Sequence, residues 1–366
     1  MKILGFGLMR PPMKDEKPDV EEMCKMVDLF MERGFTYFDT ALVYFNGESE
    51  RMAREALVKR YPRESYTMAD KLPMWRWKEQ GASLEDMFSE SLENTGLEYF
   101  DYYLIHSLTQ EYVEYADAAD AWGFVARKKE EGKVRHIGFS FHDTPELLDE
   151  ILTKHPEMEF VQLQINYADW ENERVQSRAC YEVARKHGKP VAIMEPVKGG
   201  NLATLGDAVS APFKAVRPER PMAEWAVRFA ASLPGVMIML SGMSSLEQVD
   251  ANTTTLDEVP VLSDEERAAY TQVQELMANA PTIPCTGCGY CMEGCPIGMK
   301  IPRLFRTYNE LVIFGNEENS ARVYDRVTAK SPKASECLSC YSCAEHCPQH
   351  LEIPELLVQV AAQFEK

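Results

Sequence analysis

The last quarter of the chain is organised around the stretch Cys285-Thr-Gly-Cys288-Gly-Tyr-Cys291-Met-Glu-Gly-Cys295-Pro296. A second copy follows as Cys337-Leu-Ser-Cys340-Tyr-Ser-Cys343-Ala-Glu-His-Cys347-Pro348. Both have the spacing C-x2-C-x2-C-x3-C-P, which places thiolates around an iron–sulfur cubane and turns the chain away at the proline. The fourth cysteine of each run usually binds the cluster of the other run. We therefore expect two [4Fe–4S] clusters, with a zinc site or disulfides as minor alternatives.

The two runs lie in a segment, residues 281–366, that we expect to fold as a small α-helical ferredoxin-like domain. Pro281 and Pro284 stiffen the link that leads into it. The stretch between the runs, Pro296–Glu336, is longer than a compact two-cluster ferredoxin needs. The helices expected here are Pro302–Phe314, Glu318–Ala329 and Pro354–Phe364.

Residues 1–280 alternate short apolar runs with longer amphipathic ones, as expected for strands buried on both faces and the helices between them. The expected strands are Ile3–Leu8, Thr36–Asp39, Tyr66–Ala69, Tyr102–Ile105, His136–Phe139, Phe160–Ile165, Val191–Met194 and Val236–Leu240. The expected helices include Val20–Arg33, Leu84–Thr95, Val113–Glu131, Arg174–His187, Ser245–Asn252 and Ser263–Ala278. Eight such units favour a (β/α)8 TIM barrel over an open doubly wound sheet. No G-x-G-x-x-G follows an early strand, which counts against a Rossmann domain.

Composition narrows the class of protein. The net charge of −19 argues against a nucleic-acid partner. No apolar run reaches the ~20 residues of a membrane span, and no signal peptide is visible. Eight of the ten cysteines belong to the two runs, and Cys24 and Cys180 are expected to be small buried residues. Because thiolate ligands must stay reduced, we expect a cytoplasmic protein.

Four chemically matched side chains fall at the ends of three consecutive expected strands. Asp39 ends the second strand and Tyr44 follows it, while Lys71 and His106 come at the ends of the third and fourth. A TIM barrel carries its chemistry at the C-terminal ends of its strands. The four residues are therefore expected to converge on one site.

The pattern resembles the aldo/keto reductases. The resemblance rests on Phe38-Asp39-Thr40-Ala41-x-x-Tyr44-x-x-x-Glu48, Lys71, Asp101-Tyr-Tyr-Leu-Ile-His106, Gly132-Lys-Val-Arg-His-Ile-Gly-Phe-Ser140, Val161-Gln-Leu-Gln-x-Asn166-Tyr167, and Ser241-Gly-Met243 through Asn252. The resemblance covers about residues 1–260. It is strongest to the bacterial members of the family that carry a C-terminal iron–sulfur domain. It implies an NAD(P)-linked oxidoreductase that reduces a carbonyl or oxidises an alcohol.

The chemistry of carbonyl reduction fits these residues. The reaction needs a hydride at carbon and a proton at oxygen, and Tyr44 would be the general acid/base. A free phenol has a pKa of about 10, and a neighbouring Lys71 ammonium would lower that of Tyr44. Asp39 would hold Lys71 charged and in place. His106 would bind the substrate oxygen and orient it.

The resemblance also implies a nicotinamide nucleotide that lies extended across the strand ends. By position, Ser140 and Gln162 would hold the carboxamide. Ser241, Gly242, Met243 and Gln248 would lie along the adenosine phosphate, with Asn252 at the adenine. An ordinary strand–helix turn capped by Ser244 is the alternative for that segment.

The chain departs from the family at several cofactor positions. Met194 stands where an aromatic residue usually stacks on the nicotinamide, and Phe141 replaces a polar residue after Ser140. Gly242 and Gln248 stand where many members carry cations for a 2′-phosphate, so NADP and NAD both stay open.

Two other functions remain as alternatives. The barrel could bind a different acceptor, such as a flavin or an unsaturated substrate, and receive single electrons from a soluble ferredoxin or flavodoxin through the clusters. The chain could instead be a non-catalytic redox-sensing or interaction subunit. A hydride carries two electrons and a cluster passes one, so the clusters need not lie on the hydride path. Trp75, Trp77 and Trp170 are candidates to line an apolar substrate pocket, with packing in the core or a lid as an equal alternative.

Overall fold

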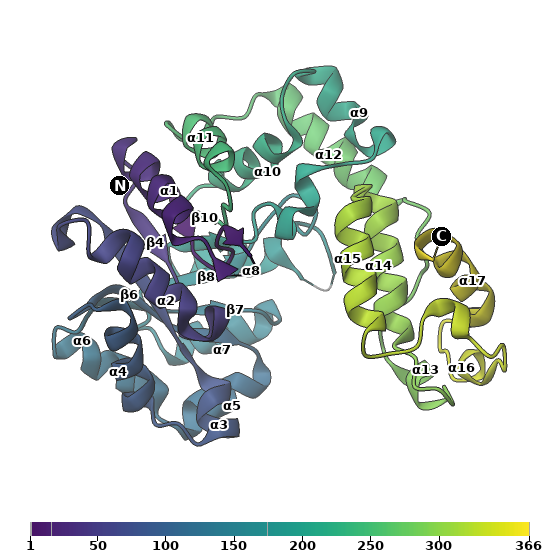
Figure 1. Ribbon diagram of the computed structural model, residues 1–366, viewed down its shortest axis with the longest axis horizontal. Coiled ribbons are helices and arrows are strands. Elements are labelled where there is room, and N and C mark those ends of the chain that lie inside the picture. The colour runs from purple at the N-terminus through teal and green to yellow at the C-terminus, as the bar shows by residue number, and fades with distance from the viewer. Residues whose placement is uncertain (1, 16, 174, 366) are drawn as a thin grey trace. The chain divides into compact units, whose positions relative to one another are not determined.

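The computed structural model describes residues 2–15, 17–173 and 175–365. The chain forms two compact units, which are described separately below. The first comprises Met1–Gly199 and Glu224–Ser263, and the second comprises Gly200–Ala223 and Asp264–Lys366. Figure 1 labels the helices of both units and several of the barrel strands.

The first unit is a closed barrel of parallel strands in the order β1-β10-β9-β8-β7-β6-β5-β4, with β4 pairing back to β1. The barrel strands in the described part of the chain are β1 (Leu4–Gly7), β4 (Tyr37–Asp39), β5 (Thr67–Pro73), β6 (Phe100–Leu108), β7 (Val134–Phe141), β8 (Phe160–Gln164), β9 (Val191–Met194) and β10 (Val236–Ser241). Each matches an expected strand, so the (β/α)8 barrel is confirmed. A hairpin of β2 (Met13–Lys14) and β3 (Lys17–Pro18), which the sequence did not predict, follows β1.

Helices surround these strands in Figure 1. They are α1 (Val20–Glu32), α2 (Glu48–Ala53), α3 (Met74–Gln80), α4 (Leu84–Thr95), α5 (Gln110–Ala118), α6 (Ala121–Glu130), α7 (Pro145–Lys154), α8 (Ser177–Lys186), α10 (Met222–Ala231) and α11 (Leu246–Thr255). Short 3-10 or π turns are η1 (Tyr44–Gly47), η2 (Arg54–Val58), η3 (Arg63–Ser65) and η4 (Lys198–Ala203).

Large and small side chains fill the barrel interior. One buried cluster contains Tyr37, Ala69, Leu104, Phe160, Ala192, Ile238 and Leu240. The fit is tight, because a Cβ placed on Gly138 would lie 2.5 Å from the carbonyl oxygen of Phe160. This packed interior fixes where each strand ends, and the strand ends carry the candidate catalytic residues.

The single helix expected over Val113–Glu131 is two helices, so this prediction was wrong. Asp120 separates α5 from α6 with a φ of 53°, a left-handed conformation that Asp tolerates better than most residues. The break allows Trp122 to be buried while its indole N–H donates to Asp117 at 2.8 Å. The expected helix start at Arg174 lies outside the described residues, and α8 begins at Ser177.

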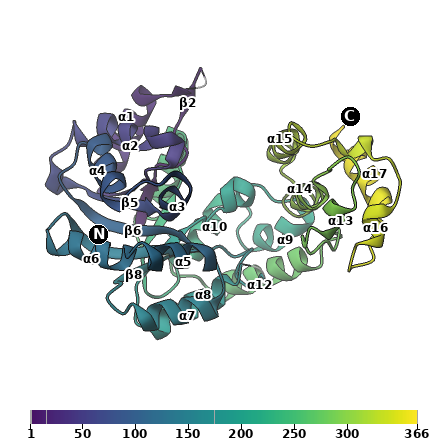
Figure 2. The same ribbon diagram turned by 90° about the horizontal axis from the view of Figure 1, so that it is seen from below.

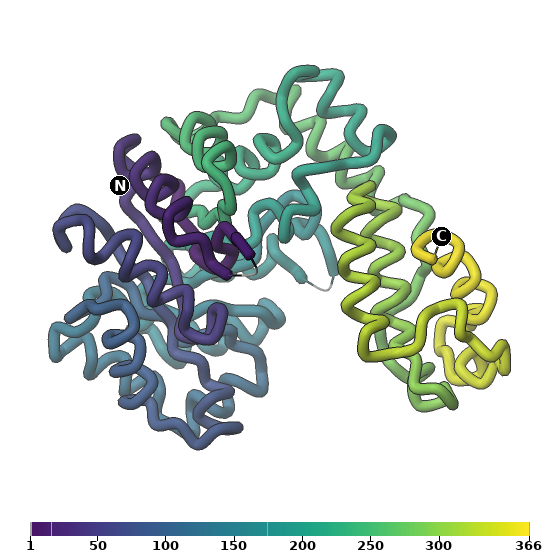
Figure 3. Tube along the Cα trace, in the orientation of Figure 1, coloured from purple at the N-terminus to yellow at the C-terminus, as the bar shows by residue number. Residues whose placement is uncertain are grey.

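The second unit is helical. It contains α9 (Asp207–Val216), α12 (Asp264–Ala278), α13 (Tyr290–Glu293), α14 (Ile301–Phe314), α15 (Glu317–Thr328), η5 (Ala334–Glu336), α16 (Ser342–Glu345) and α17 (Ile353–Phe364). Helix α9 lies beside α12 in Figure 2, with the rings of Phe213 and Tyr270 5.1 Å apart. Helices α14 and α15 run side by side in Figure 3. Residue contacts therefore group α12 and residues 200–223 with the cysteine runs. The expected domain boundary at residue 280 stays a prediction.

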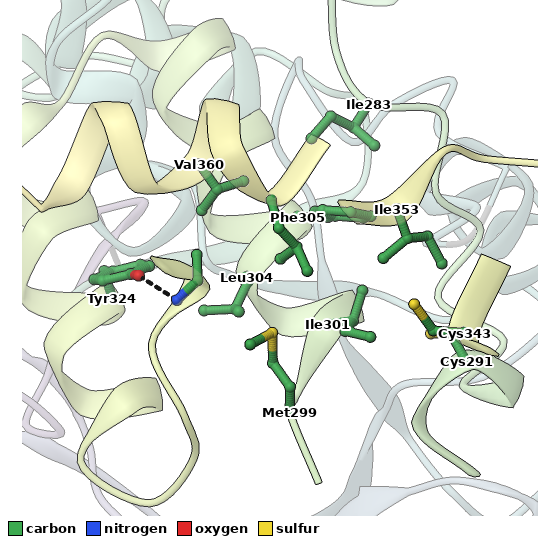
Figure 4. Packing of buried hydrophobic residues seen from close by; sticks show 12 residues of the cluster. Ile283, Cys291, Met299, Ile301, Leu304, Phe305, Tyr324, Cys343, Ile353 and Val360 are labelled. Atoms are coloured by element: carbon green, nitrogen blue, oxygen red, sulfur yellow. Dashed lines mark hydrogen bonds between the residues drawn. The ribbon is translucent and has the colours of Figure 1, made fainter. Parts of the chain in front are cut away.

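The core of the second unit forms around the two cysteine runs. Figure 4 shows Met299, Ile301, Leu304 and Phe305 of the α14 segment packed with residues of α15 and α17. Cys291 and Cys343 belong to the same buried cluster. No helix within residues 2–15, 17–173 and 175–365 has the length and apolarity of a membrane span.

Candidate active site and cysteine hollows

A buried ion pair forms the base of the candidate site. Lys71 Nζ on β5 lies 2.5 Å from Asp39 Oδ1 at the end of β4 and donates to the carbonyl of Thr40 at 2.6 Å. Burial alone would lower the pKa of Lys71, but Asp39, Tyr44 and Asp70 raise it above its ordinary value. The raised pKa keeps Lys71 charged at neutral pH within the core.

Tyr44 lies close to this ion pair, on the turn η1 that follows β4. Lys71 Nζ is 4.8 Å from the centroid of the Tyr44 ring. Burial has the largest effect and raises the pKa of Tyr44, Lys71 lowers it, and the charges of Asp39 and Asp70 raise it. Lys71 thus lowers the pKa of Tyr44 as expected, but burial outweighs this effect and the pKa lies above its ordinary value. The phenol is protonated at neutral pH and can donate a proton.

His106 on β6 completes the group. Its ring centroid lies 5.8 Å from that of Tyr44 and 5.2 Å from that of Trp75. Burial, followed by Lys71 and His142, holds the pKa of His106 well below its ordinary value, so the imidazole is neutral. Nδ1 is buried without a partner in the described structure. An orphaned N–H is rarer than an orphaned acceptor, which favours the tautomer with its proton on Nε2.

The aromatic residues near the strand ends divide into two groups. Trp75 contacts both His106 and Tyr112, whose ring centroid is 5.5 Å away, so it belongs to the wall of the site. Trp170 packs instead on Tyr181 and Phe229, with centroids 5.6 and 5.5 Å away. Of the expected pocket aromatics, Trp75 is the one placed beside a candidate catalytic residue.

The residues expected to hold a carboxamide lie on neighbouring strands. Ser140 on β7 and Gln162 on β8 are direct partners in the register and are both buried. Ser140 Oγ accepts from the backbone N–H of Ser107 at 2.6 Å, which leaves its own proton free to donate elsewhere. Met194 ends β9, where it is partly exposed.

The residues expected at the adenosine end form a compact turn between β10 and α11. Asn252 Nδ2 donates to Ser241 Oγ at 3.1 Å, and Gln248 Oε1 accepts from the Ser244 N–H at 2.7 Å. Gly242 is exposed, whereas the Met243 side chain is fully buried and leaves only its backbone for a ligand. The N-cap of α11 is Ser245, not Ser244.

Arg10 is a candidate cofactor residue that the sequence did not reveal. It follows β1, and barrel closure brings it beside the ends of β9 and β10. Its guanidinium lies 3.3 Å from Glu195 Oε1, and its carbonyl accepts from Ser244 Oγ at 3.0 Å. Its side chain also lies next to Gly242. Only the pairing of β1 with β10, implied by a closed barrel, could have pointed to it.

The eight run cysteines line two separate hollows in the second unit. The first cysteine hollow contains Cys285, Cys288, Cys291 and Cys347. The second contains Cys295, Cys337, Cys340 and Cys343. Each has three cysteines from one run and the fourth from the other, as the spacing predicted. Ile301 lines both hollows.

The cysteine hollows suit iron–sulfur clusters. Each encloses about 310 Å³ of space, solvent at its mouth included, and offers four sulfurs among mainly apolar side chains. Burial raises the pKa of Cys291 to about 12 and that of Cys343 to about 11. Metal binding would displace these protons. The Met299 N–H points at Cys295 Sγ from 3.4 Å, a contact that stabilises a thiolate.

Comparison with protein families gives two matches. The model described as "Aldo/keto reductase family" matches residues 3–275. The model described as "4Fe-4S dicluster domain" matches residues 284–351.

Individual relatives agree with the first match. An aldo-keto reductase of Mycolicibacterium vanbaalenii is 30% identical over 258 residues, which are 70% of this chain and 83% of that protein. An uncharacterized oxidoreductase of Schizosaccharomyces pombe is 26% identical over 263 residues, 68% of this chain and 79% of that protein. A solved aldo-keto reductase of Klebsiella pneumoniae, in complex with NADPH, has a TM-score of 0.58 at 21% identity and covers 74% of this chain and 90% of its own.

Proposed function

We propose a function from the premise that this chain belongs to the aldo/keto reductase family. The chain reduces a small carbonyl compound, or oxidises the corresponding alcohol, by hydride transfer with a nicotinamide nucleotide. One observation carries the proposal: Asp39, Tyr44, Lys71 and His106 converge at the ends of three adjacent strands. The same arrangement explains why Lys71 is charged while Tyr44 and His106 are neutral.

Tyr44 is the proton donor in the reductive direction. Its phenol is protonated at neutral pH because burial raises its pKa. As the phenol gives its proton to the substrate oxygen, negative charge develops on Tyr44, and the nearby Lys71 ammonium stabilises that charge. Asp39 keeps Lys71 in the charged form needed for this step.

His106 orients the substrate. A neutral imidazole with its proton on Nε2 donates one hydrogen bond to a carbonyl oxygen without competing with Tyr44 as an acid. Trp75 provides an apolar wall beside it. A neutral donor and an aromatic wall suit a small carbonyl compound with an apolar substituent.

The nicotinamide nucleotide would lie across the strand ends and supply the hydride when bound. Ser140 and Gln162 would bind its carboxamide, with Met194 packed on the ring. Ser241, Gly242, the Met243 backbone, Gln248 and Asn252 would line its adenosine end. Arg10 would supply a cation to its phosphates, since the side chains at 242 and 248 carry none. The solved Klebsiella pneumoniae relative binds NADPH, which supports a cofactor of this class.

We further propose that each cysteine hollow holds one [4Fe–4S] cluster. The first would be bound by Cys285, Cys288, Cys291 and Cys347, and the second by the other four run cysteines. The clusters would stabilise the second unit rather than carry the hydride, which moves as an electron pair. A relay of single electrons from a soluble ferredoxin or flavodoxin is the second candidate, and the exposure of Cys288 and Cys340 favours it.

Replacing Tyr44 with phenylalanine tests the function. Tyr44→Phe should lower kcat for NAD(P)H-dependent carbonyl reduction on the order of 100-fold or more, as loss of a general acid does. Its cluster absorbance should be unchanged. Tyr61→Phe, which removes a phenol bonded to Asp28 away from the strand ends, is the matched control. Full activity in Tyr44→Phe would refute the assignment.

A further inference from the structure

Two buried carboxyl groups, those of Asp70 and Glu50, have no part in the reaction described above. Asp70 precedes Lys71 on β5, and Glu50 lies on α2, just after the turn that carries Tyr44. Both are 0% exposed. Asp70 Oδ1 accepts from the Lys71 backbone N–H at 2.7 Å, and Glu50 Oε2 accepts from Asn94 Nδ2 at 2.7 Å.

The second oxygen of each carboxyl group has no donor. Asp70 Oδ2 and Glu50 Oε1 are buried without a hydrogen-bond partner among the described residues. The two groups are nevertheless within hydrogen-bonding reach of each other. Two carboxylates cannot hydrogen-bond, because neither has a proton to donate. One added proton would let one carboxyl group donate a hydrogen bond to the other.

The surroundings favour retention of that proton. Burial, followed by the Glu50 charge, raises the pKa of Asp70 well above its ordinary value, and burial also raises that of Glu50. From α4, Asn94 donates to Glu50 and the Ser91 hydroxyl lowers the pKa of Glu50, while the Glu90 charge raises it.

The cation acting on Asp70 is Lys71, which is already paired with Asp39. The Tyr103 phenol interacts with both carboxyl groups and the Tyr44 phenol with Asp70; burial raises the pKa of each phenol, so both stay neutral. No neighbouring charge therefore replaces the proton as a means of joining the two carboxyl groups.

The turn between Tyr44 and Glu50 needs such an anchor. Phe45, Asn46 and Gly47 have φ values of 50°, 54° and 83°, three consecutive left-handed residues. Non-glycine residues adopt this conformation at a cost in free energy, and it persists where the surrounding structure imposes it. Ser49 Oγ fixes one side by donating to the Leu8 carbonyl at 2.9 Å. Glu50 is the anchor on the side of β5.

We propose that Asp70 and Glu50 share one proton and act as positioning residues, which lock the turn carrying Tyr44 to the strand carrying Lys71. Loss of the proton at high pH leaves two buried carboxylates that repel each other, so the lock opens and Tyr44 loses its place beside Lys71. The kinetic test of this inference rests on the proposed carbonyl reduction. A spectroscopic test does not.

The kinetic test compares two substitutions of Asp70. An asparagine can donate to the Glu50 carboxylate and still accept from the Lys71 N–H, so Asp70→Asn keeps the lock without a titrating proton. It should retain kcat at neutral pH and lack the alkaline fall in kcat of the unmodified protein. Asp70→Ala should lose kcat on the order of 100-fold with KM little changed. Glu93→Gln, an exposed carboxyl group on α4, is the matched control.

Either of two results would overturn the proposal. The first is an unchanged kcat in Asp70→Ala. The second is an alkaline kcat profile of Asp70→Asn that coincides with that of the unmodified protein.

The spectroscopic test needs no turnover. Infrared spectra at neutral pH should show the carbonyl stretch of one buried protonated carboxyl group, absent in Asp70→Asn and in Glu50→Gln but present in Tyr44→Phe. A missing band beside an inactive Tyr44→Phe would refute the shared proton alone. A present band beside an active Tyr44→Phe would refute the proposed function alone.

Thermal stability gives a third measurement. A carboxyl group with a raised pKa in the folded state stabilises the fold most at low pH, and this contribution is lost as pH rises through the raised pKa. Asp70→Asn needs no proton and has no such loss. Its Tm relative to the unmodified protein should therefore rise between about pH 5 and about pH 9. A constant difference would contradict the shared proton.

Discussion

Replacing Asp39 with asparagine tests whether the buried ion pair sets the charge of Lys71. The Asp39 carboxylate lies 2.5 Å from Lys71 Nζ, and both side chains are almost fully buried. Burial lowers the pKa of Lys71, and Asp39 is the strongest of the groups that raise it. Asp39→Asn therefore leaves an ammonium group in the core with too little compensation, and the pKa of Lys71 should fall.

The size of the effect follows from the burial of the pair. Removing one partner of a buried ion pair costs about 3–5 kcal/mol. In a folding unit of this size, 1 kcal/mol changes Tm by roughly 2–4 °C, so Asp39→Asn should lower Tm by about 6–20 °C. Its kcat should fall on the order of 100-fold, because Tyr44 loses the charge that stabilises its phenolate. Differential scanning calorimetry and NAD(P)H-dependent carbonyl reduction measure the two effects.

The double variant Asp39→Asn/Lys71→Met separates the two effects. It removes both charges and places an apolar side chain in the core, so it should recover much of the lost Tm while kcat stays low. The non-additivity of the Tm changes measures the coupling. A double variant destabilised by the sum of the two single changes would show that the pair contributes no coupling, and the reasoning would fail.

Arg10→Gln should raise the KM for the nicotinamide nucleotide about tenfold with kcat little changed. Arg10→Lys should recover part of the loss, and an unchanged KM in Arg10→Gln would exclude Arg10 from the cofactor site. Alanine at both Cys295 and Cys337, which share a hollow, should leave about half of the iron, whereas alanine at Cys295 and Cys285 should remove nearly all of it. Equal iron contents in these two double variants would contradict the crossed ligand sets. Because burial holds the pKa of His106 well below its ordinary value, kcat/KM should stay level as pH falls from about 8 to about 6. A decline centred at about 6.5 would show that His106 titrates as an ordinary histidine.

Features set by local patterns were readable from the sequence. Helix α4 occupies Leu84–Thr95, as predicted, because Ser83 caps its start and Gly96 ends it in a left-handed conformation. The crossed grouping of the cysteines follows from their spacing. The candidate catalytic residues could be found because a strand end fixes where its side chains lie.

Features set by tertiary contacts were not readable. The motif that suggested the family ends in Glu48, yet Glu48 is exposed and pairs with Arg51 at 2.8 Å, while Glu50 is the buried carboxyl group. Glu48 and Glu50 fit the sequence pattern of helix α2 equally well, so the pattern does not tell which of them is buried. The raised pKa of Tyr44 likewise depends on how deeply the fold buries it.

The pairing of β1 with β10 sets a limit on when the barrel can form. Leu4 lies opposite Met239 in the register. The edge of β1 that pairs with β10 therefore has no partner strand until nearly two thirds of the chain has been synthesised. Contacts so distant in sequence slow folding and leave strand edges open to association with other chains. All eight run cysteines emerge later still. We therefore expect the nascent chain to need protection at the edge of β1, and iron insertion to follow barrel closure.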